Sequence, residues 1–537
     1  MSLSLLNRYA FFAFCVLFTL ASLPFLHTHE WLWAFTLTTG VLSLIGINDL
    51  LQTRQAVRRN YPILGNIRYL VEGIRPEIRQ YLLEADRDEL PFSRAQRSLV
   101  YARAKNEGAD KPFGTLINVY EAGFEFIGHS MRPAPLSDPS SFRVEIGGPQ
   151  CKQPYSASIF NVSAMSFGSL SANAIRALNQ GAKLGNFYHD TGEGSISPYH
   201  REHGGDLVWE LGSGYFGCRT ATGQFDPERF AVQAQNPQVR MIEIKLSQGA
   251  KPGHGGILPK HKVTEEISET RGVPMGEDCI SPSRHSAFST PIEMLQFIAQ
   301  LRELSGGKPV GFKFCLGHPW EFMGIAKAML ETGILPDFIV VDGKEGGTGA
   351  APVEFTDHIG VPLREGLLFV HNTLVGLNLR DKIKLGASGK IISAFDIASV
   401  LALGADWANS ARGFMFAIGC IQSQSCHTNK CPTGVATQDP LRQRALVVPD
   451  KAERVHSFHS NTLKALAEMI AAAGIDHPAH LEPRHLVRRV TAIEVRLFSQ
   501  LHVFLKPGEL LSSEISGDFY ERMWKMARAD SFEANPV

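Results

Sequence analysis

From Cys151 onward, short apolar runs alternate with helical patterns, and each run ends in a loop of glycine or polar residues. The runs are Ile159–Met165, Met241–Leu246, Val310–Cys315, Phe338–Val341, Ile383–Leu385 and Trp407–Ala411, and clear helical patterns follow at Ser171–Leu184 and Pro319–Glu331. Strands that are separated by helices pair in parallel, because a parallel connection needs a long crossover. The sequence therefore predicts an α/β fold.

Two parallel architectures fit this alternation, a closed (β/α)8 barrel of the TIM type and an open, doubly wound sheet. Neither G-x-G-x-x-G after the first strand nor G-x-x-x-x-G-K-[ST] occurs, so the nucleotide-binding open sheets lose support. In a barrel, functional residues lie on the loops that follow the strands. Glycine and polar residues gather in those loops here, and a barrel is therefore the predicted fold.

Composition narrows the class further. The 537 residues exceed one ordinary core, so more than one structural region is expected. Lys+Arg and Asp+Glu both number 53, and this balance argues against a nucleic-acid partner, which usually requires a basic excess. Eight cysteines are too few for a disulfide scaffold in a chain of this length.

The first fifty residues contain two uncharged apolar runs, Tyr9–Leu26 and Trp31–Ile47, separated by a short polar segment. Each run is near the minimum length for crossing a hydrocarbon core of about 30 Å. Arginines flank the pair on both sides, which predicts a transmembrane hairpin with both ends in the cytoplasm; they are Arg8, Arg54, Arg58 and Arg59. A cleaved signal peptide and a buried helical hairpin are the alternatives.

Three cysteines lie close together in Cys420-x5-Cys426-x4-Cys431, and Pro432 follows the last. Thiolates at this spacing can hold an iron–sulfur cluster from one loop, and a proline after a ligand cysteine recurs in such proteins. Three thiolates suit a three-iron cluster, or a four-iron cluster with one outside ligand. A zinc site with His427 as fourth ligand is the alternative.

These features predict four regions. Residues 1–50 form the transmembrane hairpin, and 51–150 form a charged, mainly helical connection with a narrow apolar stripe at Ile74, Ile78 and Leu82. Residues 151–450 form the barrel with the cysteine loop. Residues 451–537 form a C-terminal helical region.

Two late loops, Gly386–Gly389 and Ala411–Gly413, have the glycines that let backbone N–H groups approach a phosphate, and Arg412 adds a cation. Ordinary turns would look the same. A third loop, Lys245–Gly256, presents lysines without a carboxylate and suits an anionic substrate, unless it is a mobile surface loop. Lys313 lies within a strand pattern and needs a negative partner inside the barrel, either a flavin pyrimidine or a buried acid.

Together these stretches resemble the FMN-binding synthase domain of glutamate synthase, over roughly Pro154 to Asp439. The matching segments are Ser163–Ser169, Asp190–Gly194, Gln248–Gly253, Gly346–Ala350 and Cys420–Gln438 (CIQSQSCHTNKCPTGVATQ). The resemblance implies FMN at the barrel mouth and a 3Fe-4S cluster on Cys420, Cys426 and Cys431. It also implies that electrons pass from the cluster to FMN, which reduces the imine formed from 2-oxoglutarate and ammonia.

The resemblance further implies roles for individual residues. FMN would be bound by Met165, Ser166, Thr191, Lys313, Gly347, Thr348, Ser388, Gly389, Arg412 and Gly413. The substrate carboxylates would be bound by Lys251, Arg271 and Gln248, and the catalytic residues would be Lys251, Glu193 and Glu293. Arg271 could instead be an exposed helix-end cation, and Glu293 a first-turn residue favoured by the helix dipole.

The sequence departs from the family pattern at several positions. Ile257 replaces a substrate-binding glutamine, His254 replaces a common acidic residue, and Pro291 displaces a serine expected before Glu293. No glutaminase domain is expected, because Ser2 leads directly into the first apolar run, and no pyridine-nucleotide domain is visible. Free ammonia and a separate electron-donor protein, such as ferredoxin or a reductase, are therefore expected.

The sequence thus predicts a flavoprotein oxidoreductase in the cytoplasmic membrane, with its catalytic domain in the cytoplasm and 2-oxoglutarate or a related 2-oxo acid as substrate. Two alternatives remain open. The first is an FMN oxidoreductase acting on another amino or hydroxy acid, such as an N-alkyl glutamate. The second is a membrane-docked electron-transfer subunit without substrate turnover.

Overall fold

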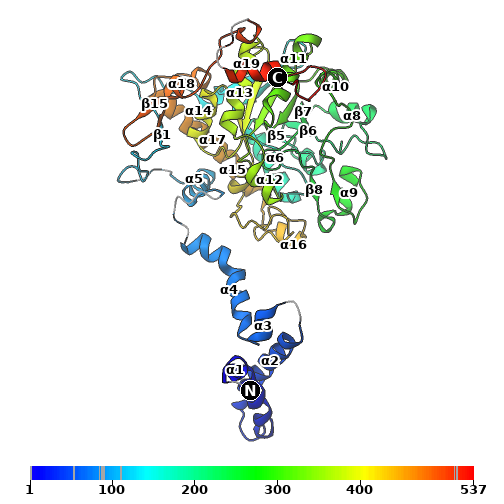
Figure 1. The fold of residues 1–537 in the computed structure, drawn as a ribbon, viewed down its shortest axis with the longest axis vertical. Coiled ribbons are helices and arrows are strands. Elements are labelled where there is room, and N and C mark those ends of the chain that lie inside the picture. The colour runs from blue at the N-terminus through cyan, green and yellow to red at the C-terminus, as the bar shows by residue number, and fades with distance from the viewer. Residues whose placement is uncertain are drawn as a thin grey trace. The chain divides into compact units, whose positions relative to one another are not determined.

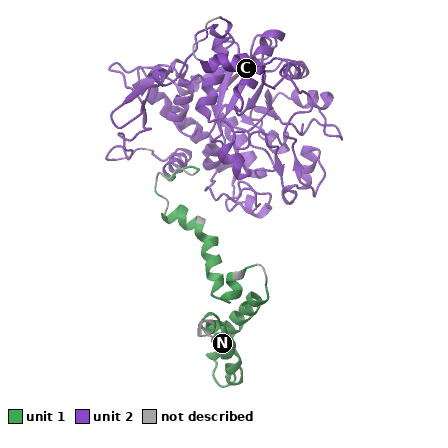
Figure 2. Cartoon of the chain, viewed as in Figure 1, with its two compact units in different colours: residues 1–94 green, residues 95–537 purple. Residues whose placement is uncertain are grey.

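A computed structural model describes residues 3–52, 55–83, 85, 91–108, 110, 112–512, 515 and 518–536. The chain divides into two compact units, Met1–Arg94 and Ala95–Val537, drawn in green and purple in Figure 2. The second unit takes in most of the predicted connecting region, the barrel and the whole C-terminal region. Arg54, one of the predicted cationic flanks, lies outside the described residues.

Eight parallel strands close into a barrel in the second unit (Figure 1). Their order around the barrel is β10-β11-β12-β13-β4-β5-β6-β7. The bounds are β4 Phe160–Val162, β5 His189–Asp190, β6 Leu207–Leu211, β7 Val239–Lys245, β10 Val310–Phe314, β11 Phe338–Asp342, β12 Lys384–Ser388 and β13 Trp407–Ser410. Closure confirms the barrel and excludes the open sheet.

The sequence patterns locate six of these strands and miss β5 and β6. Strand β5 has only two residues, too few to show any periodicity. All five residues of β6 are buried, and Glu210 interrupts its apolar run. A charged residue within a buried strand hides the strand from a hydrophobicity pattern, and its presence requires a partner inside the barrel.

Helices cover the outside of the barrel between its strands. They include α6 Ala172–Gly185, α8 Pro227–Ala234, α10 Pro291–Leu304, α11 Pro319–Thr332, α13 Leu363–Gly376, α14 Ala394–Ala402 and α15 Arg412–Ala417. Ser171 begins α6 by accepting a hydrogen bond from the backbone N–H of Ala174, and Asn186 ends it in the left-handed conformation. The predicted helix at Ser171–Leu184 is thus confirmed to within one residue at each end.

The C-terminal region packs directly on the barrel. Helix α17 (Val448–Ala472) lies along α6 and also contacts α14 and α15. Gly181 permits this close approach, because a Cβ there would lie within 2.7 Å of the Ala452 carbonyl oxygen. Helix α19 (Asp518–Met526) packs against another of the helices around the barrel, α11.

A buried ion pair joins α10 to the N-terminal ends of two barrel strands. Asp337 accepts hydrogen bonds from Arg302 at 3.0 Å and from the backbone N–H groups of Val310 and Gly148 at 2.8 and 2.7 Å. Buried carboxylates are tolerated when all their acceptor sites are filled in this way. The N-terminal ends of these strands therefore contribute to the stability of the barrel. Functional groups are expected at the opposite, C-terminal ends.

Among the described residues, three small antiparallel sheets lie outside the barrel. Strand β2 (Arg143–Ile146) pairs with β3 (Tyr155–Ser158), and β8 (Ile257–Leu258) pairs with β9 (Cys279–Ile280). The third sheet combines β1 (Glu125–Ile127) with β14 (Leu486–Arg489) and β15 (Val495–Leu497). The β8–β9 sheet belongs to the segment that follows β7, so it helps to shape the site.

The first unit contains α1 Leu3–Ser22, α2 Leu32–Leu51, α3 Ala56–Asn60 and α4 Gly65–Ile78. Within the described residues, Arg8–Phe25 and Leu32–Leu51 are long and apolar enough to cross a membrane. Hydroxyl groups join α1 to α2, since Thr19 donates to Thr39 and Thr36 donates to Ser22, both at 2.8 Å. Such side-chain bonds stabilise helix pairs in apolar surroundings.

Candidate active site

The pocket at the C-terminal end of β7 centres on one ion pair. Lys245 Nζ, from the last residue of β7, lies 3.3 Å from Oε2 of Glu193, which is in the loop after β5. The other lining residues are Ser213, Leu246, Ser247, Gln248, Gly253, His254, Gly255, Gly256, Pro282 and Ser283. Loops after successive barrel strands therefore meet here, as expected for a barrel active site.

Lys251 and Arg271 add two further cations around Glu193. Both side chains are buried, and burial together with Lys245 lowers the pKa of Lys251, although Glu193 opposes the shift. Arg271 is the last residue of α9 (Glu265–Arg271), yet its guanidinium turns inward and donates to the Phe167 carbonyl at 3.0 Å. Its Nε has no hydrogen-bond partner among the described residues. The exposed-cation alternative for Arg271 is therefore wrong.

The charge balance around Glu193 favours an anion. Burial raises the pKa of Glu193, but Lys245, Lys251 and Arg271 outweigh it and hold the pKa below its usual value. Glu193 is therefore ionised at neutral pH, and three cations face one carboxylate. Among the described residues that line the pocket, Glu193 is the only acid. A carboxylate ligand would restore the balance and replace the water lost on burial.

Gln248 also faces the pocket, as predicted. Its amide nitrogen donates to the Gly347 carbonyl at 3.1 Å, and its amide oxygen lies 3.4 Å from Lys245 Nζ. Ser281 donates to Glu193 at 3.4 Å. Gln248 thus bridges the lysine loop and the glycine loop around Gly347, two segments that the sequence could not place side by side.

Glu293 occupies a different kind of position. It is exposed, and its Oε2 accepts hydrogen bonds from the backbone N–H groups of Ser289 and Thr290 at 2.6 and 3.2 Å. Thr290 in turn accepts from the Glu293 backbone N–H, so the two residues form the capping box of α10. These contacts match the first-turn alternative, and they give Glu293 a structural role in place of a catalytic one.

Replacing Glu293 with alanine is expected to lower the free energy of unfolding, because one half of the capping box is lost. Thr290→Ala removes the other half and should have an effect of similar size. Chemical denaturation of both variants measures this change. Loss of turnover in Glu293→Ala without loss in Thr290→Ala would instead restore the catalytic role.

The residues predicted to line the flavin ring lie at the ends of β4 and β5. The backbone N–H of Met165 donates to the Asp190 carbonyl at 3.2 Å, and Ser166 donates to Ser169 at 3.1 Å. Thr191 is fully buried and follows β5 directly. Gly192 has a φ of +63°, and a Cβ there would lie 2.8 Å from the Ser166 backbone nitrogen. Only glycine lets these two loops approach so closely.

The residues predicted for the ribityl phosphate also come together. Arg412 donates to the Thr348 carbonyl at 2.5 Å, and a Cβ on Gly347 would lie 2.8 Å from the Arg412 Nε. Ser388 ends β12 and lies beside Ser163, with 3.4 Å between the hydroxyl oxygens. Gly389 follows β12 directly, and Gly413 is the second residue of α15, shortly after β13. A cation among glycines at the late strand ends fits a phosphate group.

Lys313 points into the barrel, as its strand position predicts. It is buried, and it forms ion pairs with Glu210 and with Glu243, the latter at 3.2 Å. Burial lowers the pKa of Lys313, but Glu210, Glu243 and Asp190 outweigh it and raise the pKa well above its usual value. The buried-acid alternative therefore describes its contacts, and the predicted contact with a flavin ring stays a prediction.

The three predicted cluster ligands converge from one irregular loop. Cys420 and Cys431 are buried and Cys426 is half-buried. Burial raises the pKa of Cys420 to about 11, with Cys426 and Cys431 contributing further, so the three thiols are close enough to interact. Gln422, Gln424 and Asn429 have positive φ values of 60°, 56° and 62°. These left-handed residues fold the loop inward, and three sulfur donors in one loop fit an iron–sulfur cluster.

Sequence reasoning missed two residues that hold this loop. Lys262 Nζ donates to the carbonyl oxygens of Cys426 and Ser169 at 3.3 and 3.1 Å. The Tyr101 hydroxyl donates to the Cys420 carbonyl at 2.7 Å. Both residues are far from the cysteines in the sequence, so no motif could have connected them.

Fold and site together define a parallel β/α barrel with a cationic pocket at the C-terminal ends of its strands and a three-thiol loop beside it. A family model described as the conserved region in glutamate synthase matches residues 144–476. The chain belongs to this glutamate synthase family.

Several curated relatives are similar to the chain. The glutamate synthase large subunit-like protein YerD of Bacillus subtilis is 38% identical over 485 residues, which cover 83% of this chain and 92% of that protein. The archaeal-type glutamate synthase [NADPH] of Thermotoga neapolitana is 35% identical over 315 residues, 58% of this chain and 59% of that protein. The match therefore spans nearly all of YerD and about three fifths of the archaeal-type enzyme.

Solved structures show lower similarity. The recombinant flavin-binding domain of baker's yeast flavocytochrome b2 has a TM-score of 0.40 and 13% identity, and the match covers 83% of this chain and 87% of that chain. A similarity at this level carries no argument about the chemistry, which rests on the residues of the site.

Proposed function

We propose that this protein is an FMN-dependent oxidoreductase that reductively aminates a 2-oxo acid, with 2-oxoglutarate and glutamate as substrate and product. The single observation that carries the proposal is the convergence of Lys245, Lys251 and Arg271 on Glu193 at the mouth of the barrel. Three cations, of which Lys251 and Arg271 are buried, lie beside one ionised carboxylate and suit a dianionic substrate and an ammonium ion at the same site.

Each charged residue has a role in this proposal. Lys251 and the inward-facing Arg271 bind the substrate carboxylates, and Gln248 adds a neutral hydrogen-bond donor. Glu193 stays ionised, so its Oε2 can accept a proton from ammonium and return that proton to the leaving water as the imine forms. Lys251 and Arg271 interact with Glu193, which lines the pocket, so both proposed carboxylate-binding cations lie beside it.

The chain also has groups that fit both proposed cofactors. Arg412 with Gly347, Gly389 and Gly413 would hold the FMN phosphate, and Met165, Ser166 and Thr191 would line the ring. Cys420, Cys426 and Cys431 would hold a 3Fe-4S cluster. Bound FMN would supply hydride and the cluster single electrons.

Electrons would come from a separate donor protein that docks near the cysteine loop. We further propose that α1 and α2 anchor the chain as a hairpin in the cytoplasmic membrane, with the barrel in the cytoplasm. Their apolar surfaces are exposed within the first unit, including Phe14, Leu17, Leu20, Leu37 and Leu44. An alkaline carbonate wash should leave the protein in the membrane fraction, whereas a peripheral protein would be released.

One observation also favours a second class of substrate. Ile257, where the family has a substrate-binding glutamine, is 52% exposed in the two-stranded β8–β9 sheet. Its neighbour Gly256 lines the pocket, so the altered position borders the site. An N-alkylated or otherwise extended amino acid would use this apolar border, whereas a pure electron-transfer subunit would have no use for Lys251 and Arg271.

The test follows flavin absorbance. The detergent-solubilised, cofactor-loaded protein is reduced photochemically without oxygen and mixed with ammonium and candidate 2-oxo acids. Rapid reoxidation by 2-oxoglutarate, with glutamate as product, is the expected result. Reoxidation only by a different acid would reassign the substrate, and reoxidation by none would contradict the enzyme proposal.

A further inference from the structure

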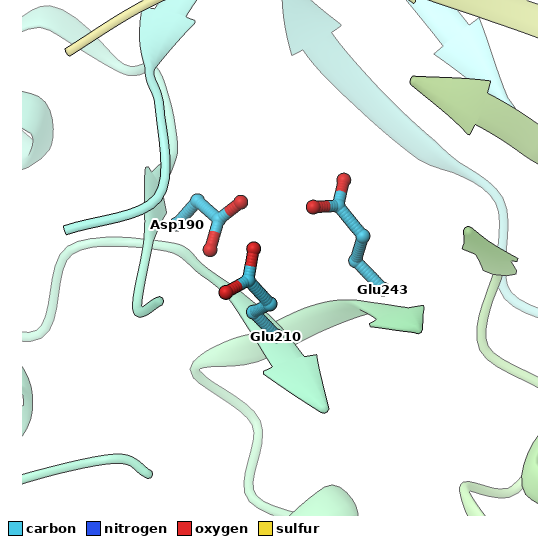
Figure 3. Close-up of side chains that lie close together, drawn as sticks. All are labelled: Asp190, Glu210 and Glu243. Atoms are coloured by element: carbon cyan, nitrogen blue, oxygen red, sulfur yellow. The ribbon is translucent and has the colours of Figure 1, made fainter. Parts of the chain in front are cut away.

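Three carboxylates from adjacent barrel strands meet inside the barrel (Figure 3). Asp190 on β5, Glu210 on β6 and Glu243 on β7 each place an oxygen within 4.8 Å of the other two. The strand register produces this cluster, because Glu210 is paired directly with Glu243 and both side chains therefore point the same way. We call these residues the carboxylate trio.

The cations near the trio are too few to neutralise its carboxylates. Lys313 on β10 forms ion pairs with Glu210 and Glu243, so its ammonium group takes the place that a metal ion would fill. A fourth acid, Asp342 at the end of β11, also faces this interior. Unbalanced buried charge costs several kcal/mol per ion. Among the described residues, one ammonium thus faces four acids here, and at least one carboxyl must keep a proton.

Within the trio, the pKa values of Asp190 and Glu243 are both raised. Burial, then Glu243, raises the pKa of Asp190 well above its usual range, against the opposing effect of Lys313. Burial raises the pKa of Glu243 to about 7, again against Lys313 and with Glu210 adding to the rise. A group with this pKa changes its protonation near neutral pH in response to a modest change in nearby charge.

Hydrogen bonds connect the trio to the loops predicted to line the flavin. Asp190 accepts from the Gly192 backbone N–H at 2.9 Å, and its carbonyl accepts from the Met165 N–H. The Glu210 backbone N–H donates to the Thr191 hydroxyl at 3.2 Å. The trio is therefore joined by hydrogen bonds to the loops predicted to line the flavin.

We propose that the carboxylate trio is a proton-holding unit. It takes up a proton when negative charge develops at the predicted flavin site, and it releases the proton when that charge leaves. The inference rests on the proposed function, because it requires flavin to bind there. The two electrons come from the donor protein and leave as hydride to the substrate imine. One proton from solvent leaves within that hydride. A second proton, the one that the trio holds, comes from solvent and returns to it, so charge and atoms balance over one cycle.

The other groups around the trio do not take this role. Burial, then Glu243 and Asp190, raises the pKa of Tyr188 well above its usual value, so this phenol stays neutral. Lys313 stays charged, because its pKa is raised. Burial raises the pKa of Asp342, but Lys313 and hydrogen bonds from Gly249 and Ser388 oppose this. The responding members are therefore Asp190 and Glu243.

The experiment counts protons. The full-length, FMN-loaded protein is photoreduced in weakly buffered solution, and an indicator dye reports proton uptake per flavin reduced. Near pH 7 the wild type should take up more protons than Glu243→Gln, by up to one per flavin. The difference should vanish about one pH unit or more below the Glu243 pKa, where the carboxyl is already protonated. Glu321→Gln, which removes another carboxyl of raised pKa, should match the wild type.

Equal uptake by the three proteins with flavin fully bound would overturn the proposal. If Glu243→Gln and Asp190→Asn both lose flavin, the infrared difference spectrum of the wild type decides: a protonated-carboxyl band should grow on reduction, and its absence overturns the proposal. Failure of the proposed function looks different. A protein that reacts with no 2-oxo acid can still show the uptake difference, whereas one that binds no flavin refutes both.

Discussion

Replacing Lys251 with alanine is expected to abolish reoxidation of the reduced flavin by 2-oxoglutarate and ammonium while FMN stays bound. Lys251 is buried beside Lys245 and Glu193, so a substrate carboxylate there meets a largely desolvated cation. Removing one partner of a buried charge pair costs about 2–5 kcal/mol. The rate constant at subsaturating substrate should therefore fall roughly 10²- to 10³-fold, measured by anaerobic stopped-flow absorbance.

The control for this variant is Lys260→Ala. Lys260 is exposed a few residues further along the same segment, and its backbone N–H, which the substitution keeps, donates to Asp278 at 2.7 Å. The control should react like the wild type. If Lys251→Ala loses FMN, or if it reacts as fast as the control, then Lys251 does not bind the substrate.

Replacing Cys426 with serine is expected to eliminate the paramagnetic signal of the iron–sulfur cluster. A three-iron cluster needs one thiolate for each iron, so losing one of the three ligands leaves an iron without its sulfur. Iron content should fall with the signal, measured by electron paramagnetic resonance and by metal analysis of the purified protein. Flavin absorbance should persist, because the FMN positions lie on other loops.

Cys151→Ser provides the matched control. Cys151 is half-buried like Cys426, and its thiol donates to the Gly307 carbonyl at 3.4 Å, a bond that a serine hydroxyl can keep. Iron content and signal should equal those of the wild type. An unchanged signal in Cys426→Ser would show that this cysteine is not a ligand.

Much of the fold is predictable because its determinants are local. The predicted helix Pro319–Glu331 matches α11 to within one residue, since Pro319 marks its start and an apolar periodicity runs to its end. Strand β5 escapes prediction because two residues cannot display a period. Glu293 shows that local signals can also correct a resemblance: threonine three residues before glutamate is a capping-box signature, and it indicates the structural role that the contacts of Glu293 display.

The cluster ligands are predictable for the same reason. Cys420, Cys426 and Cys431 lie in one short segment, so their spacing alone limits what they can bind. The partners of Lys313 are not predictable by residue. Its strand position requires a negative charge inside the barrel, but Glu210 and Glu243 lie 103 and 70 positions earlier in the chain, and only barrel closure brings them to it.

The sequence by itself determined the α/β class, the two apolar helices and the three-thiol loop, because each depends on periodicity or spacing within a few tens of residues. Only the tertiary structure decided that Arg271 turns inward, that three cations surround Glu193, and that one ammonium is shared among buried acids. Those arrangements depend on the register between strands far apart in the chain. Burial then makes the charges interact strongly, because little water remains to screen them.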